Sequence, residues 1–179
     1  MEGGNGMDLG PSDKVKPILE QVKAFIDNEI LPVEREYHEE VDKGDRWQYT
    51  ERQTEILEDL KKKARAKNLW NFFLTHWEGG YGLNTVEYSY IAEETGRSHL
   101  APEVFNCSAP DTGNMEVLAR YCSDEQKKKW LVPLLNGEIR SAYAMTEPGV
   151  ASSDAKNISM SCVLDGDEWV LNGEKIWIS

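Results

Sequence analysis

The stretch YAMTEPGVASSD, residues 143–154, follows the point at which the sequence changes from helical to β-type patterning. It begins like a buried strand and then replaces apolar residues with hydroxyl side chains, a Pro-Gly pair and two acids. A chain that only reverses direction can do so with two residues such as Asn-Gly. The extra polar groups raise a question of function, and the patterns on either side of the stretch define the fold in which to answer it.

Upstream, apolar residues recur at intervals of three and four, which predicts amphipathic helices. The expected helices cover 12–31, a segment beginning at Thr50, 85–96, 111–121 and a segment beginning at Ser123. We expect Pro32 to end the first helix, because proline lacks a backbone donor and clashes with the preceding turn. Gly96 is expected to be the C-cap of the third helix, and Ser123 with Gln126 has the spacing of a capping box.

Downstream of about Gly137, the pattern is that of short strands joined by hairpins. The expected strands cover 139–145, 158–164, 169–171 and 176–178. Asp165-Gly166 and Asn172-Gly173 supply two hairpin signals. The predicted fold class is therefore α+β, an N-terminal all-helical domain followed by the start of an antiparallel β-sheet or β-barrel. The expected division is a flexible tail over 1–10, a helical domain over 11–138 and a partial β-domain over 139–179.

The composition limits the classes of partner that the chain is expected to bind. With 40% hydrophobic residues and a formal net charge of -12, the 179-residue chain is expected to fold and not to bind nucleic acid, whose phosphates need a basic surface. The lysines at 61–63 are interpreted as a solvated helix face. The widely spaced cysteines predict reduced thiols, and the scattered histidines predict no structural metal site. The sequence shows neither an apolar run of membrane-spanning length nor the regions of a signal peptide.

The residue types of 143–154 suit a flat, anionic ligand. Thr146 ends the expected strand and would present its hydroxyl, with nearby backbone amides, at the rim of the sheet. The small residues 150–153 offer amides and hydroxyls suited to a diphosphate. Trp177 and Ser179 have the alternation of residues on one strand face and could complete a ring-binding cleft. The alternative is a Pro-Gly turn whose Ser and Asp side chains bond to their own backbone.

A second glycine-containing segment is interpreted differently. Gly80-Tyr81-Gly82 resembles the beginning of GxGxxG, but Asn84-Thr85 stand where the last glycine is needed. No βαβ pattern surrounds it, and the segment therefore predicts a tight loop leading into a helix. We reject a Rossmann site for NAD on this basis.

Several ordered motifs resemble those of the acyl-CoA dehydrogenase family. They are YAMTEPG at 143–149 with SD at 153–154, NGEKIWIS at 172–179, EGGYGL at 78–83, IAEETGRS at 91–98 and LARYCSDEQK at 118–127. The first two resemble the flavin-binding signature and the second flavin segment of the family, and the others resemble its N-terminal helical domain. The match covers nearly the whole chain after the first ten residues and looks closest to the large animal members with an upstream kinase-like domain.

By this resemblance the cofactor is FAD. The implied contacts are Tyr143, Met145, Thr146, Ser152, Ser153, Trp177, Ile178 and Ser179. Trp177 and Ser179 would cover the second face of the flavin ring and hold its polar edge. The turn is one residue longer than the family's commoner Gly-x-Gly-Ser-Asp, so Ser152 and Ser153 are alternatives for the diphosphate contact. We favour Ser153, which directly precedes Asp154 and would also contact the acyl-CoA substrate.

The resemblance implies an oxidoreductase of fatty acid β-oxidation that converts acyl-CoA to trans-2-enoyl-CoA and passes electrons to an electron-transferring flavoprotein. It also implies a homo-oligomer in the mitochondrial matrix or, alternatively, the peroxisome. The family's catalytic carboxylate lies in a C-terminal helical domain, so we expect no catalytic residue here, and Glu147 is assigned a structural or surface role. Because four short strands would leave unpaired edges, we expect an N-terminal fragment that is inactive alone. The alternative is a non-catalytic binding or oligomerisation module.

Overall fold

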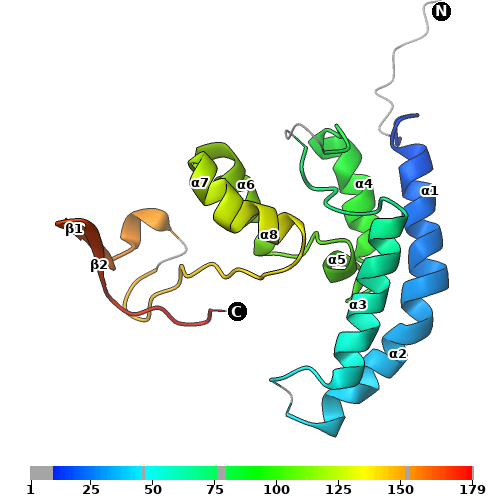
Figure 1. The fold of residues 1–179 in the computed structure, drawn as a ribbon, viewed down its shortest axis with the longest axis horizontal. Coiled ribbons are helices and arrows are strands. Elements are labelled where there is room, and N and C mark those ends of the chain that lie inside the picture. Colours follow the sequence, from blue (N-terminus) through cyan, green and yellow to red (C-terminus); the bar gives the residue numbers. More distant parts are fainter. Residues whose placement is uncertain (1–9, 46, 76–79, 152–153, 179) are drawn as a thin grey trace, which may run out of the picture. The chain divides into compact units, whose positions relative to one another are not determined.

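The protein is described by a computed structural model, which covers residues 10–45, 47–75, 80–151 and 154–178 (Figure 1). The chain forms two compact units, Met1–Thr112 and Gly113–Ser179. The first unit contains α1 (Lys16–Phe25), η1 (Ile26–Ile30), α2 (Leu31–Glu40), η2 (Val41–Lys43), α3 (Glu51–Ala66), α4 (Thr85–Thr95) and α5 (Ala101–Val104). Helix α6 (Asp111–Tyr121) crosses the division. The second unit continues with α7 (Asp124–Gln126), η3 (Lys127–Leu131), α8 (Val132–Leu135), η4 (Ala155–Asn157), β1 (Ser161–Asp165) and β2 (Glu168–Asn172).

The observed fold confirms the predicted fold class, since a helical region is followed by an antiparallel hairpin. Helix α3 begins with a complete capping box between Thr50 and Gln53. Ser123 and Gln126 form the predicted box at the start of α7. Gly96 is the C-cap of α4, although it keeps a right-handed φ of -65°. The predicted domain boundary between residues 138 and 139 stays a prediction.

Pro32 does not end the first helix, contrary to the expectation from sequence. The chain passes from α1 through the π-helical turn η1 into α2, whose first turn contains Pro32. In η1 the Leu31 N–H bonds to the carbonyl of Ile26, five residues back. Because the first turn of a helix needs no donor from proline, the wide turn lets the helical path continue through Pro32. Pro133 follows the π-helical turn η3 in the same way.

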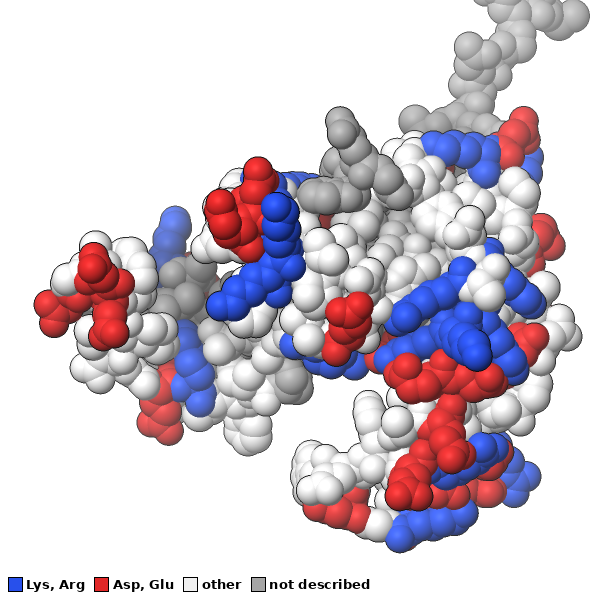
Figure 2. All heavy atoms as spheres, in the orientation of Figure 1, with Lys and Arg blue, Asp and Glu red and all other residues white. Residues whose placement is uncertain are grey.

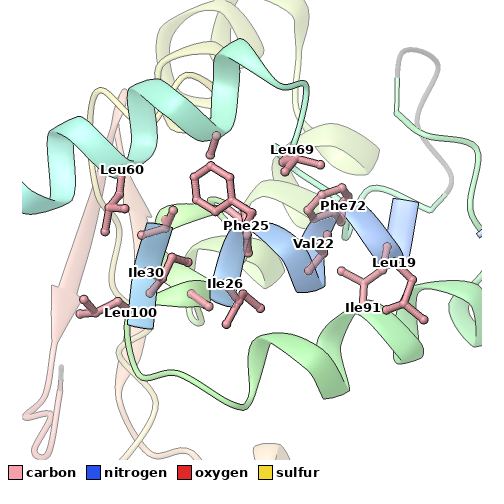
Figure 3. Packing of buried hydrophobic residues seen from close by; sticks show 14 of the residues in the cluster. Leu19, Val22, Phe25, Ile26, Ile30, Leu60, Leu69, Phe72, Ile91 and Leu100 are labelled. Carbon is pink, nitrogen blue, oxygen red and sulfur yellow. The ribbon is translucent and has the colours of Figure 1, made fainter. Parts of the chain in front are cut away.

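The core of the first unit lies along the apolar face of α1 and η1 (Figure 3). The buried residues of this face are Val15, Leu19, Val22, Phe25, Ile26 and Ile30. Figure 3 shows Leu60 of α3 and Ile91 of α4 pointing toward this face from the helices on either side of it. The Phe25 and Phe105 rings have centroids 5.5 Å apart, and Phe72 lies 5.7 Å from Phe105. The apolar residues that recur every three or four positions in the sequence therefore form the buried face of this helical segment.

The lysines at 61–63 were interpreted as a solvated face, which is wrong for Lys61. The Lys61 side chain is only 10% exposed, and its Nζ lies 2.7 Å from Glu103 Oε1. The interpretation failed because Glu103 comes from α5, far along the chain. Lys63 pairs with Glu29 at 3.0 Å and with Asp59 at 2.9 Å. Figure 2 shows the wider pattern on one face, where Lys and Arg atoms lie directly beside Asp and Glu atoms.

The β-region contains fewer strands than the sequence predicts. Within the described residues, the sheet consists of β1 and β2, paired antiparallel with Val163 opposite Val170. The segments 139–145 and 176–178 were expected to be strands but have no strand ladder in this structure. A single backbone hydrogen bond, from the Ile176 N–H to the Thr146 carbonyl at 2.9 Å, joins their ends. Trp177 has a φ of 57°, outside the β-region, so strand alternation cannot extend through it.

Candidate cofactor site

The segments singled out by sequence lie together in the second unit, in the orange to red part of the ribbon in Figure 1. The turn at 143–149 meets residues 159–160, which directly precede β1, and residues 173–178, which follow β2. The hairpin of β1 and β2 therefore carries two of the three segments. This arrangement brings residues far apart in the sequence into one hydrogen-bonded cluster.

Glu147 is the centre of this cluster. Its Oε2 accepts hydrogen bonds from the Ser159 hydroxyl at 2.7 Å and the Ser159 N–H at 2.8 Å, and its Oε1 accepts one from the Met160 N–H at 2.9 Å. These hydrogen bonds, the Ser159 hydroxyl first, and a further one from Lys175 lower the pKa of Glu147 to about 2, against the opposing effect of burial. Of the two roles expected for Glu147, the structure shows the structural one.

Lys175 connects the third segment to the first. Its Nζ donates to the Met145 carbonyl and to Glu147 Oε1, each at 2.9 Å. The side chains of Lys175 and Glu147 are 15% and 3% exposed, so the ion pair is largely removed from water. The backbone bond from Ile176 to Thr146 lies next to it. Two neighbouring residues of one segment are thus fixed to the carbonyls of two neighbouring residues of the other.

Gly173 allows this approach. A Cβ on Gly173 would lie 2.7 Å from Met160 Cγ, 2.9 Å from its Cβ and 3.0 Å from its Cα. Contacts this short involve the backbone of Met160, which a rotamer change cannot move. Only glycine therefore lets the chain after β2 pass over Met160.

The residues predicted to contact FAD fall into two groups. Ser152, Ser153 and Ser179 lie outside the described residues. The remaining five lie on the two joined segments, at Tyr143, Met145, Thr146, Trp177 and Ile178. Tyr143 is 61% exposed and Trp177 is 86% exposed. Large aromatic surface and the exposed Thr146 are thus available to a ligand beside a rigid, buried support.

Asp154 follows the local alternative considered for this turn. Its carboxylate accepts a hydrogen bond from the Lys156 N–H at 3.1 Å and so caps the short helix η4. Its own N–H donates to the Ala151 carbonyl at 3.2 Å. The Asp of the motif therefore stabilises the end of the turn, as expected for an Asp that bonds to neighbouring backbone.

Sequence reasoning missed Ser159, Met160, Gly173 and Lys175 as parts of this arrangement. Lys175 lies within the second resembling motif but had no assigned role, and Gly173 was assigned only to a hairpin turn. The available signal was a glutamate next to a Pro-Gly turn, in a segment otherwise made of small residues. Because the partners lie between 12 and 28 residues away, their identity could not be read from local spacing.

A separate cavity of about 320 Å³ lies elsewhere in the second unit. Its lining residues are Asn114, Val117, Leu118, Trp130, Leu134, Ile139, Arg140 and Ser141. The Asn114 amide donates to the Ser141 hydroxyl at 2.9 Å across one wall. Of the predicted FAD contacts that the structure describes, none lines this cavity.

The cysteines and the remaining potential metal ligands give no sign of a second reactive site within the described residues. Cys107, Cys122 and Cys162 are free thiols, and burial raises the pKa of Cys107 to about 11, which disfavours a reactive thiolate. Across the ranges that the structure covers, no three His, Cys, Asp or Glu side chains are grouped so as to hold a metal ion. The described helices include none with the length and apolar character needed to cross a membrane.

The family profile and the curated proteins compared with this chain are all acyl-CoA dehydrogenases. The family profile described as "Acyl-CoA dehydrogenase, N-terminal domain" matches residues 12–138. Acyl-CoA dehydrogenase family member 10 of Mus musculus is 46% identical over 99% of this chain and 17% of its own length. Member 11 of Homo sapiens is 48% identical over 93% of this chain and 21% of its own length. The chain therefore spans about a fifth of the length of these curated relatives.

Solved structures extend the likeness to the fold. A Mycobacterium abscessus protein assigned to the acyl-CoA dehydrogenases has a TM-score of 0.81 and 49% identity, covering 94% of this chain and 43% of its own. An acyl-CoA dehydrogenase from Bacillus anthracis, solved in complex with FAD, has a TM-score of 0.59 and 30% identity, covering 93% of this chain and 26% of its own.

Proposed function

The chain belongs to the acyl-CoA dehydrogenase family, and on this basis we propose that it forms the flavin-binding part of an FAD-dependent enzyme. The proposed reaction oxidises acyl-CoA thioesters to trans-2-enoyl-CoA. We propose acyl-CoA as the substrate, an electron-transferring flavoprotein as the electron acceptor and a homo-oligomer as the assembled form. The proposed compartment is the mitochondrial matrix, with the peroxisome as the alternative.

One observation carries the proposal. The two segments that resemble the family's flavin motifs, 143–149 and 172–179, are hydrogen-bonded to each other through Lys175 and Ile176. Their buried side holds Glu147, while Tyr143 and Trp177 expose most of their surface. A pre-formed support with exposed aromatic and hydroxyl groups fits a planar heterocycle, because binding then costs little reorganisation.

The residues of the chain have distinct roles in this proposal. Tyr143, Met145 and Thr146 would line the flavin ring, with a hydrogen bond from the Thr146 hydroxyl, and Ser179 would hold its polar edge. Trp177 and Ile178 would cover the ring with apolar surface, as aromatic side chains do when they stack on planar ligands. Ser153, or alternatively Ser152, would bind the diphosphate. Bound FAD would supply the hydride acceptor that no amino-acid side chain provides.

The same proposal assigns proton removal to a carboxylate outside this chain. Glu147 is the acid within the turn motif, but its oxygens already accept hydrogen bonds from Ser159, Met160 and Lys175. With a pKa of about 2, it is also a weak base at neutral pH. We therefore propose that the chain binds the cofactor and contacts the substrate, and that it does not turn over acyl-CoA alone.

A flavin titration of the purified chain tests the proposal. Flavin fluorescence should change saturably, and Thr146→Ala should weaken binding about twofold to tenfold, the usual effect of losing one hydrogen bond. Thr54→Ala is the matched control, because Thr54 is an exposed threonine of α3. Absence of saturable binding by the unmodified chain would contradict the proposal for this chain.

A second candidate function, a non-catalytic binding or oligomerisation module, is favoured by one face of the hairpin. This face consists of the cross-strand pairs Cys162 with Leu171 and Leu164 with Trp169. All four residues are exposed. Sedimentation equilibrium and FAD titration of the unmodified chain and of Leu171→Ser together distinguish the two functions. A non-catalytic module predicts self-association that is lost in Leu171→Ser and no saturable FAD binding by either protein, whereas the flavin-binding proposal predicts saturable FAD binding by both.

A further inference from the structure

We propose that the Glu147–Lys175 ion pair is a positioning element that holds the two cofactor-binding segments in register. The inference rests on the proposed function, since the segments are assigned to FAD there. It assigns Glu147 and Lys175 no contact with the cofactor. Their role is to fix the backbone that carries Thr146 on one side and Trp177 on the other.

The first step is that Glu147 is saturated with donors. The Ser159 hydroxyl, the Ser159 N–H, the Met160 N–H and Lys175 Nζ all donate to its two oxygens at distances of 2.7 to 2.9 Å. An ionised carboxylate offers about four acceptor positions. Every donor comes from a segment other than the turn that contains Glu147. The side chain therefore ties its own turn to both flanks of the hairpin.

The second step is that Lys175 sets the register. Its Nζ bonds to Met145 O and Glu147 Oε1, while the next residue, Ile176, bonds through its N–H to Thr146 O. No strand ladder joins these segments in the described residues, so these three bonds carry the alignment. A shift by one residue would break all three together. The chain at Gly173 cannot move toward Met160 to accommodate such a shift, because the two residues are already too close for a Cβ on Gly173.

The third step concerns Trp177, which directly follows the anchored pair of residues. Its φ of 57° is unusual for a bulky residue, and its side chain is mostly in water and contributes little packing. The conformation must therefore be maintained by the neighbouring backbone, of which Lys175 and Ile176 are the fixed part. Loosening the ion pair should release Trp177 as well.

The chemistry of substitution follows from the donors. In Glu147→Gln, either orientation of the amide turns its NH2 toward a donor, either the Ser159 N–H or the Met160 N–H with Lys175. In Lys175→Met, Glu147 keeps the Ser159 and Met160 donors, and the bonds from Lys175 Nζ to Met145 O and to Glu147 Oε1 are both lost. Exchanging the two residues should not restore the site, because a lysine at 147 cannot accept hydrogen bonds from Ser159 and Met160.

Amide hydrogen exchange and FAD titration of the full chain test the proposal. Glu147→Gln and Lys175→Met should each speed exchange of the Ile176 amide at least tenfold, although Glu147 makes no bond to Ile176. Glu147→Gln should weaken FAD binding at least tenfold and Lys175→Met less, and the exchanged double variant should remain weak. Amides of the β1–β2 ladder should keep their exchange rates in both variants, whereas a loss of global stability would speed exchange there as well.

Glu87→Gln is the matched control. Glu87 is also a buried carboxylate, and it accepts hydrogen bonds from Ser12 Oγ at 2.6 Å and Asn84 N–H at 2.9 Å in the first unit. Its variant should leave FAD binding and Ile176 exchange unchanged. Unchanged Ile176 exchange in Lys175→Met overturns the positioning role, whether or not FAD binds. Failure of the unmodified chain to bind FAD contradicts the proposed function alone, because the exchange measurement needs no cofactor.

Discussion

Trp177→Gly should weaken FAD binding without destabilising the chain. A non-glycine residue in the left-handed region costs about 1–2 kcal/mol, and Trp177 has a φ of 57°. Glycine adds a cost of about 0.5–1 kcal/mol, because the unfolded chain becomes more flexible. The Trp177 side chain is almost fully exposed, so its removal forfeits little burial. The net change in the local opening free energy should lie between zero and about 1.5 kcal/mol in favour of the variant.

Two measurements on the same sample check this expectation. Exchange of the Ile176 amide, which bonds to Thr146, should be unchanged or up to about tenfold slower in the variant. FAD affinity should fall about twofold to tenfold, as expected when one aromatic stacking contact is lost. Trp47→Gly is the control, because Trp47 is equally exposed but belongs to the first unit. Faster exchange at Ile176 would refute the argument from backbone conformation, and unchanged FAD affinity would refute the assigned contact.

Three further predictions concern the stability of the structure. Gly173→Ala should unfold the segment after β2 and raise exchange at Ile176, because its Cβ would lie 3.0 Å from Met160 Cα; normal exchange would show that the backbone can yield. Protonation of Glu147 should release the turn: its folded pKa is lowered, so its contribution to stability is present above the usual glutamate pKa of 4.5 and is lost as pH falls through about 2. A protection factor of the Ser159 amide, corrected for the intrinsic pH dependence of exchange, that stays constant between these values would contradict this. Lys61→Met should lower the free energy of unfolding in urea by about 3–5 kcal/mol, because it leaves the mostly buried Glu103 without its cation, and adding Glu103→Leu should recover most of this loss. A double variant as unstable as Lys61→Met would contradict this account.

The sequence could predict features that depend on neighbouring residues. A capping box joins residues three positions apart, so the beginnings of α3 and α7 were readable from Thr50 and Ser123. The apolar period of the first helix likewise predicted its buried face. Lys61 was misjudged because its partner, Glu103, lies on another helix. Long-range pairing of charges leaves no local signal.

The candidate site likewise has features that could be predicted from the sequence and features that could not. Its exposed residues were identified through the resemblance of two short motifs, each of which lies within one segment. The buried bonds between the segments, from Lys175 to Glu147 and from Ile176 to Thr146, depend on the hairpin that folds one segment back on the other. The strands expected at 139–145 and 176–178 failed for a related reason, since a strand exists only with a paired neighbour.

The π-helical turn η1 also sets the rotational phase of the helix that follows it. Each residue turns an α-helix by about 100°, so removing one residue from 26–30 would rotate α2 by about that angle relative to α1. Tyr37, now buried on α2, would turn away from the core, and Pro32 would meet a carbonyl of the preceding turn. The wide turn therefore fixes which side of α2 the core receives, and a single-residue deletion there should be far more damaging than the same deletion in a surface loop.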